Sequence, residues 1–504
     1  MKLSVIVATL LTALAAVDVQ GYTNPITIVG YRMFDNKTGD SFAVKGIDYY
    51  PRPNAGKLNE NNHDFFTDAH YDVWKDDIDY LASTGANAVR LYAVDPSKSH
   101  DMFMCALRAK GMYALIDLAA SCTNCSVTIE KYPTCYPAAL RERGRQIILA
   151  FAKYDNVLAF SAGNEVNNEV PEDAAINAPC QKKFVRDMRN FIGECSSIRK
   201  IPVGLVVADP DTAKNNREVN AKYYNCRGNN DKYENAEWYG INAYQYCDHD
   251  QKTLAAATGF NKLQTDFASY GMTIPVMLTE YGCLNVKFPK VGEYEAQRTW
   301  LQAGWLFSSD FRKTFSGGFA FEYSTEIVNV KAAFPFTSYD AGNYGLGYFK
   351  PANCNHDDIK CEYVPMPNYD NLATQYKAVN VTSETKMSAF KSDRTVLPTC
   401  PTGFPKLSDI TWESDTVASK FSCPTAVQSH TCEGQQSSGT WATGSGSGTH
   451  SSTPSGSNSD STSGSTSSSG SSATTTTANE ANRQNSLVAV VSVTLLSAIL
   501  HTLF

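Results

Sequence analysis

Two glutamates, Glu165 and Glu280, each stand at the end of an apolar, strand-like segment. Glu165 closes the motif Ala-Gly-Asn-Glu after the run 157–160, and Glu280 lies in Thr-Glu-Tyr-Gly after the run 274–278. Two carboxyl groups can break a glycosidic bond, because one protonates the leaving oxygen while the other attacks the anomeric carbon. Asn164, directly before the first glutamate, can hydrogen-bond the sugar 2-hydroxyl. The alternative is that two of the chain's many acidic residues happen to end strands.

Strand-like and helix-like segments alternate from about residue 22 to 397, and these elements must position the two glutamates. The strand candidates are 43–50, 88–94, 112–119, 157–163, 202–208, 238–244, 274–280 and 318–323. The clearest amphipathic segments are 73–83, 100–110, 138–154, 180–196, 263–270 and 295–307. This alternation predicts an α/β fold, a (β/α)8 barrel whose active site lies at the carboxyl ends of the strands. A doubly wound open sheet is the alternative, but no Gly-rich phosphate loop follows the first strand.

The composition is that of one large globular domain with appendages. The chain has 504 residues, 42% of them hydrophobic, and a net charge of −7. That charge offers no basic patch for nucleic acid, so no nucleic-acid partner is expected, and we expect a monomer. The 27 tyrosines can stack on sugar rings, although most tyrosines bridge core and surface. The sequence has no metal or cofactor motif, and hydrolysis or transfer of a glycoside requires none.

Both ends of the chain carry the pattern of targeting signals. Residues 1–21 read as a secretory signal peptide, with a basic start and an apolar run. Residues 480–504 read as a GPI-anchor signal, with Asn479 as the expected attachment residue and the outer face of the plasma membrane and the cell wall as the expected location. A tail-anchoring helix is the alternative. The Ser/Thr/Gly-rich stretch 437–479 cannot bury enough apolar surface to fold and is expected to be a disordered stalk.

Fourteen cysteines in a secreted chain predict disulfides. Metal or redox chemistry is the alternative for Cys122-x-x-Cys125, but no second pair stands at metal-ligand spacing, so a structural role is favoured. Cys180 and Cys195 lie at opposite ends of one expected helix and cannot pair with each other, so Cys180 is expected to meet the loop 122–135. The segment 398–436 holds three cysteines and is too short to fold unless it is stapled to the barrel.

Three sequons fit the same secretory compartment. They are Asn36, Asn124 and Asn380. Asn124 is the doubtful one, because a bridge at Cys125 would restrict access to it.

Five segments, in this order, resemble those of a known family: 46–50 (GIDYY), 88–92 (AVRLY), 160–168 (FSAGNEVNN), 238–244 (WYGINAY) and 279–283 (TEYGC). The family is that of the fungal β-1,3-glucanosyltransferases of glycoside hydrolase family 72, the GAS, GEL and PHR type. The resemblance implies a retaining enzyme on a (β/α)8 barrel, with Glu165 as acid/base and Glu280 as nucleophile. Some members carry a further Cys-rich carbohydrate-binding module after the barrel, and this chain has no room for one before its stalk.

The resemblance also implies substrate-binding residues and support for the nucleophile. Asn164 matches the sugar-binding Asn of the family, and four tyrosines fall where the family lines its cleft or holds the nucleophile: Tyr49, Tyr92, Tyr244 and Tyr323. For each tyrosine the alternative is packing at the barrel rim. Arg90 shares a strand face with Tyr92 and can keep Glu280 ionised, with a buried structural ion pair as the alternative. Asp117, at the end of the third expected strand, could either cap a helix or loop or contact a sugar.

Disulfide pairs implied by the resemblance are Cys247–Cys283 and Cys226–Cys400, and Cys354–Cys361 is expected within an enlarged loop, 333–363. Cys105 has no cysteine at the place of its family partner, near 71–75. The expected reaction cleaves an internal β-1,3 linkage of a donor glucan and transfers the retained chain to the non-reducing end of an acceptor glucan. The alternatives are a retaining endo-β-1,3-glucanase and a catalytically silent glycan-binding protein of the wall.

Overall fold

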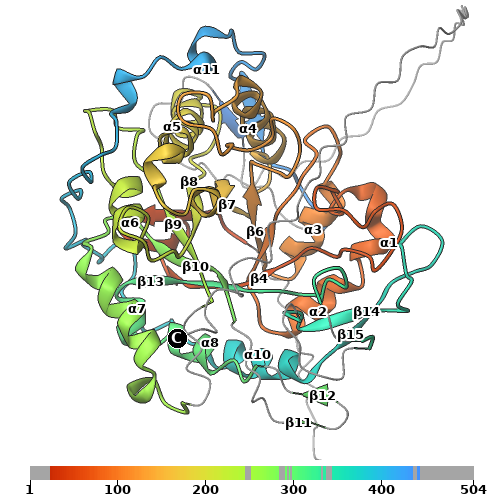
Figure 1. The fold of residues 1–504 in the computed structure, drawn as a ribbon. Helices are drawn as coiled ribbons and strands as arrows, with labels where there is room; N and C mark the ends of the chain where they lie inside the picture. Colours follow the sequence, from red (N-terminus) through yellow and green to blue (C-terminus); the bar gives the residue numbers. More distant parts are fainter. Residues whose placement is uncertain are drawn as a thin grey trace, which may run out of the picture. The chain divides into compact units, whose positions relative to one another are not determined.

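Eight parallel strands close into a barrel in the order β10-β13-β4-β5-β6-β7-β8-β9, as the sequence predicted. The structure is a computed structural model that describes residues 23–244, 251–282, 290–291, 294–295, 298–330, 333–335, 343–434 and 440–442. Figure 1 shows the strands at the centre of the molecule with the helices outside them. The barrel strands are β4 (Val44–Asp48), β5 (Ala88–Leu91), β6 (Tyr113–Asp117), β7 (Val157–Asn164), β8 (Val203–Ala208), β9 (Tyr239–Ala243), β10 (Val276–Tyr281) and β13 (Phe315–Ala320).

The outer layer consists of helices that follow the strands along the chain. The longer ones are α3 (Asp101–Ala109), α4 (Ala138–Phe151), α5 (Ala178–Glu194), α6 (Arg217–Asn225), α7 (Thr258–Ser269) and α10 (Pro367–Ala378). The shorter ones are α1 (Tyr71–Trp74), α2 (Asp77–Ser83), α8 (Leu301–Leu306), α9 (Ser309–Arg312) and α11 (Glu413–Thr416). The segment 73–83, expected as one helix, is divided between α1 and α2, and α6 was not anticipated.

The eighth barrel strand, β13, differs most from its prediction, which began at residue 318. It starts at Phe315 and includes Gly317 and Gly318, two residues with low strand propensity. Their lack of a side chain is required by close packing: a Cβ on Gly317 would lie 2.1 Å from the carbonyl oxygen of Val44, and one on Gly318 would lie 2.4 Å from that of Leu278. The two glycines therefore allow β13 to pair with both β4 and β10.

A small antiparallel sheet packs against the amino-terminal end of the barrel. Its strands are β1 (Ile26–Val29), β2 (Arg32–Asp35) and β3 (Ser41–Phe42). Ile26 and Met33 of this sheet share a buried cluster with Val44 and Ala88, which begin the barrel strands β4 and β5. The sheet thus covers this end of the barrel. The active site is therefore expected at the opposite end, where the barrel strands have their carboxyl termini.

Loops at the carboxyl end of the barrel are braced by disulfides. Cys135 in the loop before α4 is bonded to Cys180 in α5, as expected for a partner in that loop, and Cys122 is bonded to Cys125. Cys354 and Cys361 are bonded within the connection of the hairpin β14 (Gly347–Lys350) and β15 (Glu362–Pro365). The remaining described strands form the pairs β11 (Lys290–Val291) with β12 (Tyr294–Glu295), and β16 (Ala426–Gln428) with β17 (Thr440–Ala442).

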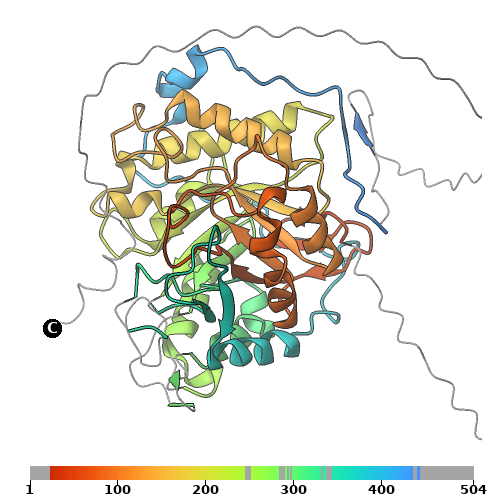
Figure 2. The same cartoon turned by 90° about the vertical axis from the view of Figure 1, so that its right-hand side faces the viewer.

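The segment 398–434, here called the C-terminal strap, runs along the outside of the barrel helices (blue in Figures 1 and 2). Three disulfides hold it: Cys226–Cys400, Cys195–Cys423 and Cys105–Cys432. Noncovalent contacts lie between these bridges. Trp412 is 3% exposed, and Asp415 lies 2.7 Å from Lys183 of α5.

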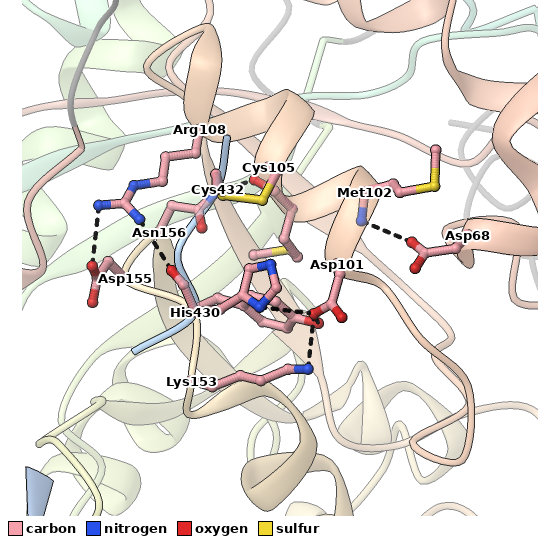
Figure 3. Close-up of a disulfide and its surroundings, with 12 residues drawn as sticks. Asp68, Asp101, Met102, Cys105, Arg108, Lys153, Asp155, Asn156, His430 and Cys432 are labelled. Carbon is pink, nitrogen blue, oxygen red and sulfur yellow. Dashed lines mark hydrogen bonds and ion pairs between the residues drawn. A yellow bond between two sulfur atoms is a disulfide. The ribbon is translucent and has the colours of Figure 1, made fainter. Parts of the chain in front are cut away.

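The bridge between Cys105 and Cys432 supplies the partner of Cys105, which the sequence analysis left open. Figure 3 shows this bridge joining α3 to the strap, with His430 beside Asp101. The His430 Nδ1 lies 3.4 Å from the Asp101 carboxylate, and the His430 backbone N–H donates to the Lys153 carbonyl at 2.7 Å. A strap cysteine therefore replaces the partner that is missing from the region 71–75.

Some expectations concern residues that the structure does not describe. The signal peptide 1–21, the GPI segment 480–504 with Asn479, the bridge Cys247–Cys283 and all of the stalk 437–479 except 440–442 lie outside the described residues. Within the described part of the chain, no helix has both the length and the apolar character needed to cross a bilayer.

Candidate active site

Glu280 lies in β10, the seventh barrel strand, and both oxygens of its carboxylate accept hydrogen bonds. Oε1 accepts from the Arg90 Nη1 at 3.1 Å and from the Tyr92 hydroxyl at 2.9 Å, and Oε2 accepts from the Tyr244 hydroxyl at 2.6 Å. The residue is only 7% exposed. A cation and two hydroxyl donors around one buried carboxylate hold it in one orientation through charge-assisted hydrogen bonds.

Arg90 binds a second carboxylate besides Glu280. It is fully buried, and its Nε and Nη2 donate to the two oxygens of Asp117 at 3.3 and 2.9 Å. The Nη2 also donates to the Asn164 Oδ1 at 3.0 Å. The two roles considered for Arg90 thus coincide, because it contacts Glu280 and also forms a buried ion pair. Asp117, for which a cap or a sugar contact was open, is buried in that pair.

Glu165 directly follows β7 and has a backbone conformation that is unusual for glutamate. Its φ of 50° and ψ of 30° place it in the left-handed region, which costs a non-glycine residue about 1 to 2 kcal/mol. Its N–H donates to the Val206 carbonyl at 3.0 Å, which ties the turn to β8. Residues held in such conformations are concentrated at functional sites.

The Glu165 carboxyl has a neutral hydrogen-bond donor beside it. The Asn242 Nδ2 donates to the Glu165 Oε1 at 2.8 Å. Burial, followed by the negative charge of Glu280, raises the pKa of Glu165 to about 7, while the Asn242 hydrogen bond and Arg90 oppose the rise. Glu165 is therefore protonated just below neutral pH, as a general acid must be.

Asn242 contacts Glu165 from the strand that neighbours Glu280, and the sequence analysis did not single it out. It lies opposite Glu280 in the pairing of β9 with β10, and its Nδ2 also donates to the Asn164 Oδ1 at 3.2 Å. Thr279 orients it by donating to the Asn242 Oδ1 at 2.9 Å. Its position inside the motif Trp-Tyr-Gly-Ile-Asn-Ala-Tyr, at a strand end, is the signal that could have identified it.

Asn164, Tyr92 and Tyr244 are accessible enough to meet a ligand. Asn164 is exposed at the end of β7, and both tyrosines are partly exposed. Tyr92 follows β5 and Tyr244 follows β9, so side chains from different strands converge on the same end of the barrel. This convergence is typical of (β/α)8 enzymes.

Tyr49 and Tyr323 were expected to contact a glucan, and the structure contradicts this expectation because both side chains are buried. They are 0% and 1% exposed, and their hydroxyls donate to the Asp77 carboxylate at 2.9 and 2.8 Å. Burial raises the pKa of Asp77 to about 7, and the two tyrosine hydrogen bonds oppose that rise. The structure places both rings in the packing role that was the alternative, because a buried carboxyl on α2 takes their hydroxyls.

The three sequons differ in exposure. Asn124 and Asn380 are exposed, whereas Asn36 is half-buried and its enclosed Oδ1 has no hydrogen-bond partner among the described residues. Asn124 has a φ of 61° and stands between the bridged Cys122 and Cys125.

One group among the described residues has the geometry of a metal cluster, and it is Cys105, Cys432 and His430. The two sulfurs are joined in the disulfide of Figure 3, so neither is a thiolate ligand.

Comparison with known proteins agrees with this geometry. A family model described as Glucanosyltransferase (Glyco_hydro_72) matches residues 15–332. The chain is 32% identical over 310 residues to the 1,3-beta-glucanosyltransferase GAS2 of Saccharomyces cerevisiae, an alignment that covers 60% of this chain and only 50% of that protein. It is 32% identical over 383 residues to the 1,3-beta-glucanosyltransferase gel1 of Aspergillus fumigatus, covering 75% of this chain and 72% of that one.

A solved structure shares the fold. Saccharomyces cerevisiae Gas2p in complex with laminaritriose and laminaritetraose superimposes with a TM-score of 0.58 and 27% identity, covering 75% of this chain and 73% of that one. The matched family model, the similar proteins and the shared fold agree with the resemblance found in the sequence. This chain belongs to the glucanosyltransferases of glycoside hydrolase family 72.

Proposed function

We propose that this chain is a retaining 1,3-β-glucanosyltransferase that elongates and remodels cell-wall β-1,3-glucan. The observation that carries the proposal is the contrast between two carboxyl groups at one end of the barrel. Glu280 has a cation and two hydroxyl donors, and Glu165 has a neutral amide and a pKa of about 7. One is prepared to attack as a carboxylate and the other to donate a proton.

In the first step, the Glu280 carboxylate attacks the anomeric carbon of an internal glucose unit. A bond forms between a Glu280 oxygen and that carbon, and the bond from the carbon to the glycosidic oxygen breaks. Glu165 transfers its proton to the departing oxygen, so the released chain leaves as an alcohol. The retained chain is then a covalent ester of Glu280.

In the second step, an acceptor hydroxyl replaces Glu280. Glu165, now a carboxylate, takes the proton of that hydroxyl while the hydroxyl oxygen of the acceptor attacks the anomeric carbon. The ester bond breaks and Glu280 leaves as a carboxylate, which Arg90, Tyr92 and Tyr244 stabilise. Two inversions restore the β configuration, and the acceptor has been lengthened by the retained chain.

The substrate follows from the family and from the tyrosines near Glu280. Gas2p is solved with laminaritriose and laminaritetraose, and we propose that β-1,3-glucan chains are donor and acceptor here as well. Asn164 is proposed to bind the sugar beside the nucleophile, and Tyr92 and Tyr244 to hold Glu280 beneath it. No metal or cofactor is part of the proposed chemistry.

The proposed organisation places this reaction outside the cell. Residues 22–397 form the catalytic domain, 398–436 the extension, and 437–479 a stalk that joins the domain to a GPI anchor at Asn479. The signal peptide 1–21 and the anchor signal 480–504 are removed. Sugar attachment is proposed at Asn36, Asn124 and Asn380, a bridge at Cys247–Cys283, and a monomer as the working form.

The proposal is tested with residues 22–443 and a linear β-1,3-gluco-oligosaccharide of one defined length, with products followed by mass spectrometry. Products longer than the starting chain are expected, because only transfer to a sugar makes them. Shorter products alone would make the protein an endo-β-1,3-glucanase. Binding without any change of length would make it a glycan-binding protein of the wall. The Glu280→Gln variant is the control for contaminating enzymes.

A further inference from the structure

Asp48 is a buried carboxyl group beside the nucleophile that has no part in the chemistry above. It is the last residue of β4, and its Cα lies opposite that of Arg90 in β5. It is 1% exposed, and among the described residues neither oxygen of its carboxyl group has a hydrogen-bond partner. An ionised carboxylate without a hydrogen bond is strongly disfavoured in such a place.

The adjacent cation, Arg90, has no donor free for Asp48. Its Nε and Nη2 serve Asp117, Nη2 also serves Asn164, and Nη1 serves Glu280. The Nη1 further lies 3.5 Å from the Tyr92 hydroxyl, and that hydroxyl donates to Glu280. An ionised Asp48 would therefore be a third anion around one guanidinium group.

The other groups that face Asp48 make ionisation still less favourable. Burial, followed by the charge of Glu280, holds the pKa of Asp48 well above its usual range, while Arg90 and the nearby Tyr92 hydroxyl oppose this; the single hydrogen of that hydroxyl is donated to Glu280. The titratable groups around it, from five parts of the fold, are Arg90, Tyr92, Asp117, Glu280, Tyr281, Glu322 and Tyr376. Arg90 is the cation in this set, and the others are carboxyl groups or phenols.

We propose that Asp48 is a positioning residue for the nucleophile and that it acts as a neutral carboxylic acid. As a neutral acid it leaves the Arg90 guanidinium group to Glu280 and Asp117. Loss of its proton would add a competing anion and weaken the contact that orients Glu280. The proposal rests on the proposed role of Glu280, and the tests below separate the two.

The first test needs no substrate and uses the full chain. Infrared spectra are recorded at neutral pH in the Glu165→Gln background, which removes the titration of Glu165. The C=O stretching band of a protonated carboxylic acid should lose intensity on the further change Asp48→Asn. It should keep that intensity on Asp117→Asn: burial raises the pKa of Asp117, but Arg90 opposes this and donates a hydrogen bond to each Asp117 oxygen, which favours the carboxylate. No loss with Asp48→Asn, or an equal loss with Asp117→Asn, would overturn the proposal.

The second test uses transfer activity as a function of pH, with the same pair of variants. Replacing an ionised neighbour of Glu280 by an amide should move the acid limb of the profile to lower pH, because a repelling charge is removed. Asp117→Asn should show this displacement, whereas Asp48→Asn should leave the acid limb in place, because the amide is as neutral as the acid it replaces. A displacement in Asp48→Asn equal to that of Asp117→Asn would overturn the proposal. Asp48→Leu, also neutral and similar in size, repeats both tests if Asp48→Asn does not fold.

Failure of the proposed function has a different signature. A wild-type protein that makes no longer products, yet loses the infrared band on Asp48→Asn, would refute the transferase and retain the neutral acid. A transferase whose infrared band is insensitive to Asp48→Asn would refute the neutral acid alone.

Discussion

Glu165 and Glu280 have the same side chain at the same end of the barrel, but different environments. Glu280 lies within β10, with Arg90, Tyr92 and Tyr244 on its two oxygens. Glu165 sits just past a strand in a left-handed conformation, with Asn242 as its donor. The donors of Glu280 stabilise a negative charge, whereas the burial of Glu165 penalises one. In the proposed mechanism, this difference in environment, and not the residue type, distinguishes the nucleophile from the acid.

Replacement of the nucleophile should have the largest effect. Glu280→Gln keeps the size of the side chain but cannot form the ester, so transfer should fall by roughly 10³-fold or more. Product formation from a β-1,3-gluco-oligosaccharide measures the loss. Glu169→Gln is the matched control, because Glu169 is an exposed glutamate close to Glu165 in the chain. Equal losses of transfer activity in Glu280→Gln and Glu169→Gln would contradict the assignment of Glu280 as the nucleophile.

Replacement of the acid should have the next largest effect, with a pH signature of its own. Because the pKa of Glu165 is raised to about 7, its acid form and the activity should both decline above about pH 7. Glu165→Gln should lower transfer by about 10²- to 10⁴-fold, the usual range for a general acid, and should abolish this alkaline limb. A residual activity with the wild-type alkaline limb would show that another group supplies the proton.

Loss of a hydroxyl donor to Glu280 should have an intermediate effect. A hydrogen bond to a charged group contributes about 1.5 to 3 kcal/mol, so Tyr244→Phe should lower kcat about 10- to 100-fold. Tyr92→Phe should cost less, because Arg90 still donates to the same oxygen of Glu280. Tyr49→Phe is the control: it should lower the melting temperature and leave kcat almost unchanged. A larger kcat loss in Tyr49→Phe than in Tyr244→Phe would contradict the assignment.

Loss of the amide beside Glu165 should have the smallest effect. Asn242 lowers the pKa of Glu165 by hydrogen bonding, so Asn242→Ala should raise that pKa by up to about one unit. Because the acid form is then retained at higher pH, the alkaline limb should move upward while the maximal rate changes little. A downward displacement, measured in the same oligosaccharide assay, would show that Asn242 stabilises the protonated form instead.

The barrel and the two glutamates could be predicted from the sequence, because strand ends, alternation and motif spacing are local patterns. The eighth strand was harder to predict, because Gly317 and Gly318 have low strand propensity. They are needed there because a side chain would collide with Val44 or Leu278. Asn242 stood inside a recognised motif, but its role depends on β9 lying beside β10. Spacing along one strand cannot show a contact between two strands.

The remaining differences have a similar cause. Tyr49 and Tyr323 bind Asp77 of α2, which is 28 and 246 residues away from them along the chain. The same limit holds for the partner of Cys105, because the number of cysteines does not determine their connectivity. Side chains that meet only after the chain has folded leave no local pattern in the sequence.

The three disulfides of the strap can form only late in the synthesis of the chain, because each needs a cysteine near the C-terminal end of the folded domain. Cys105 is separated from Cys432 by 327 residues, and Cys195 from Cys423 by 228. At about 5 to 20 residues per second, Cys105 waits roughly 15 to 65 seconds for its partner to be synthesised. Cys122, Cys125 and Cys135 follow Cys105 in the chain and are synthesised within that interval. The native bond of Cys105 can therefore form only if its thiol stays free, or is released by exchange from an earlier disulfide, until Cys432 has been synthesised.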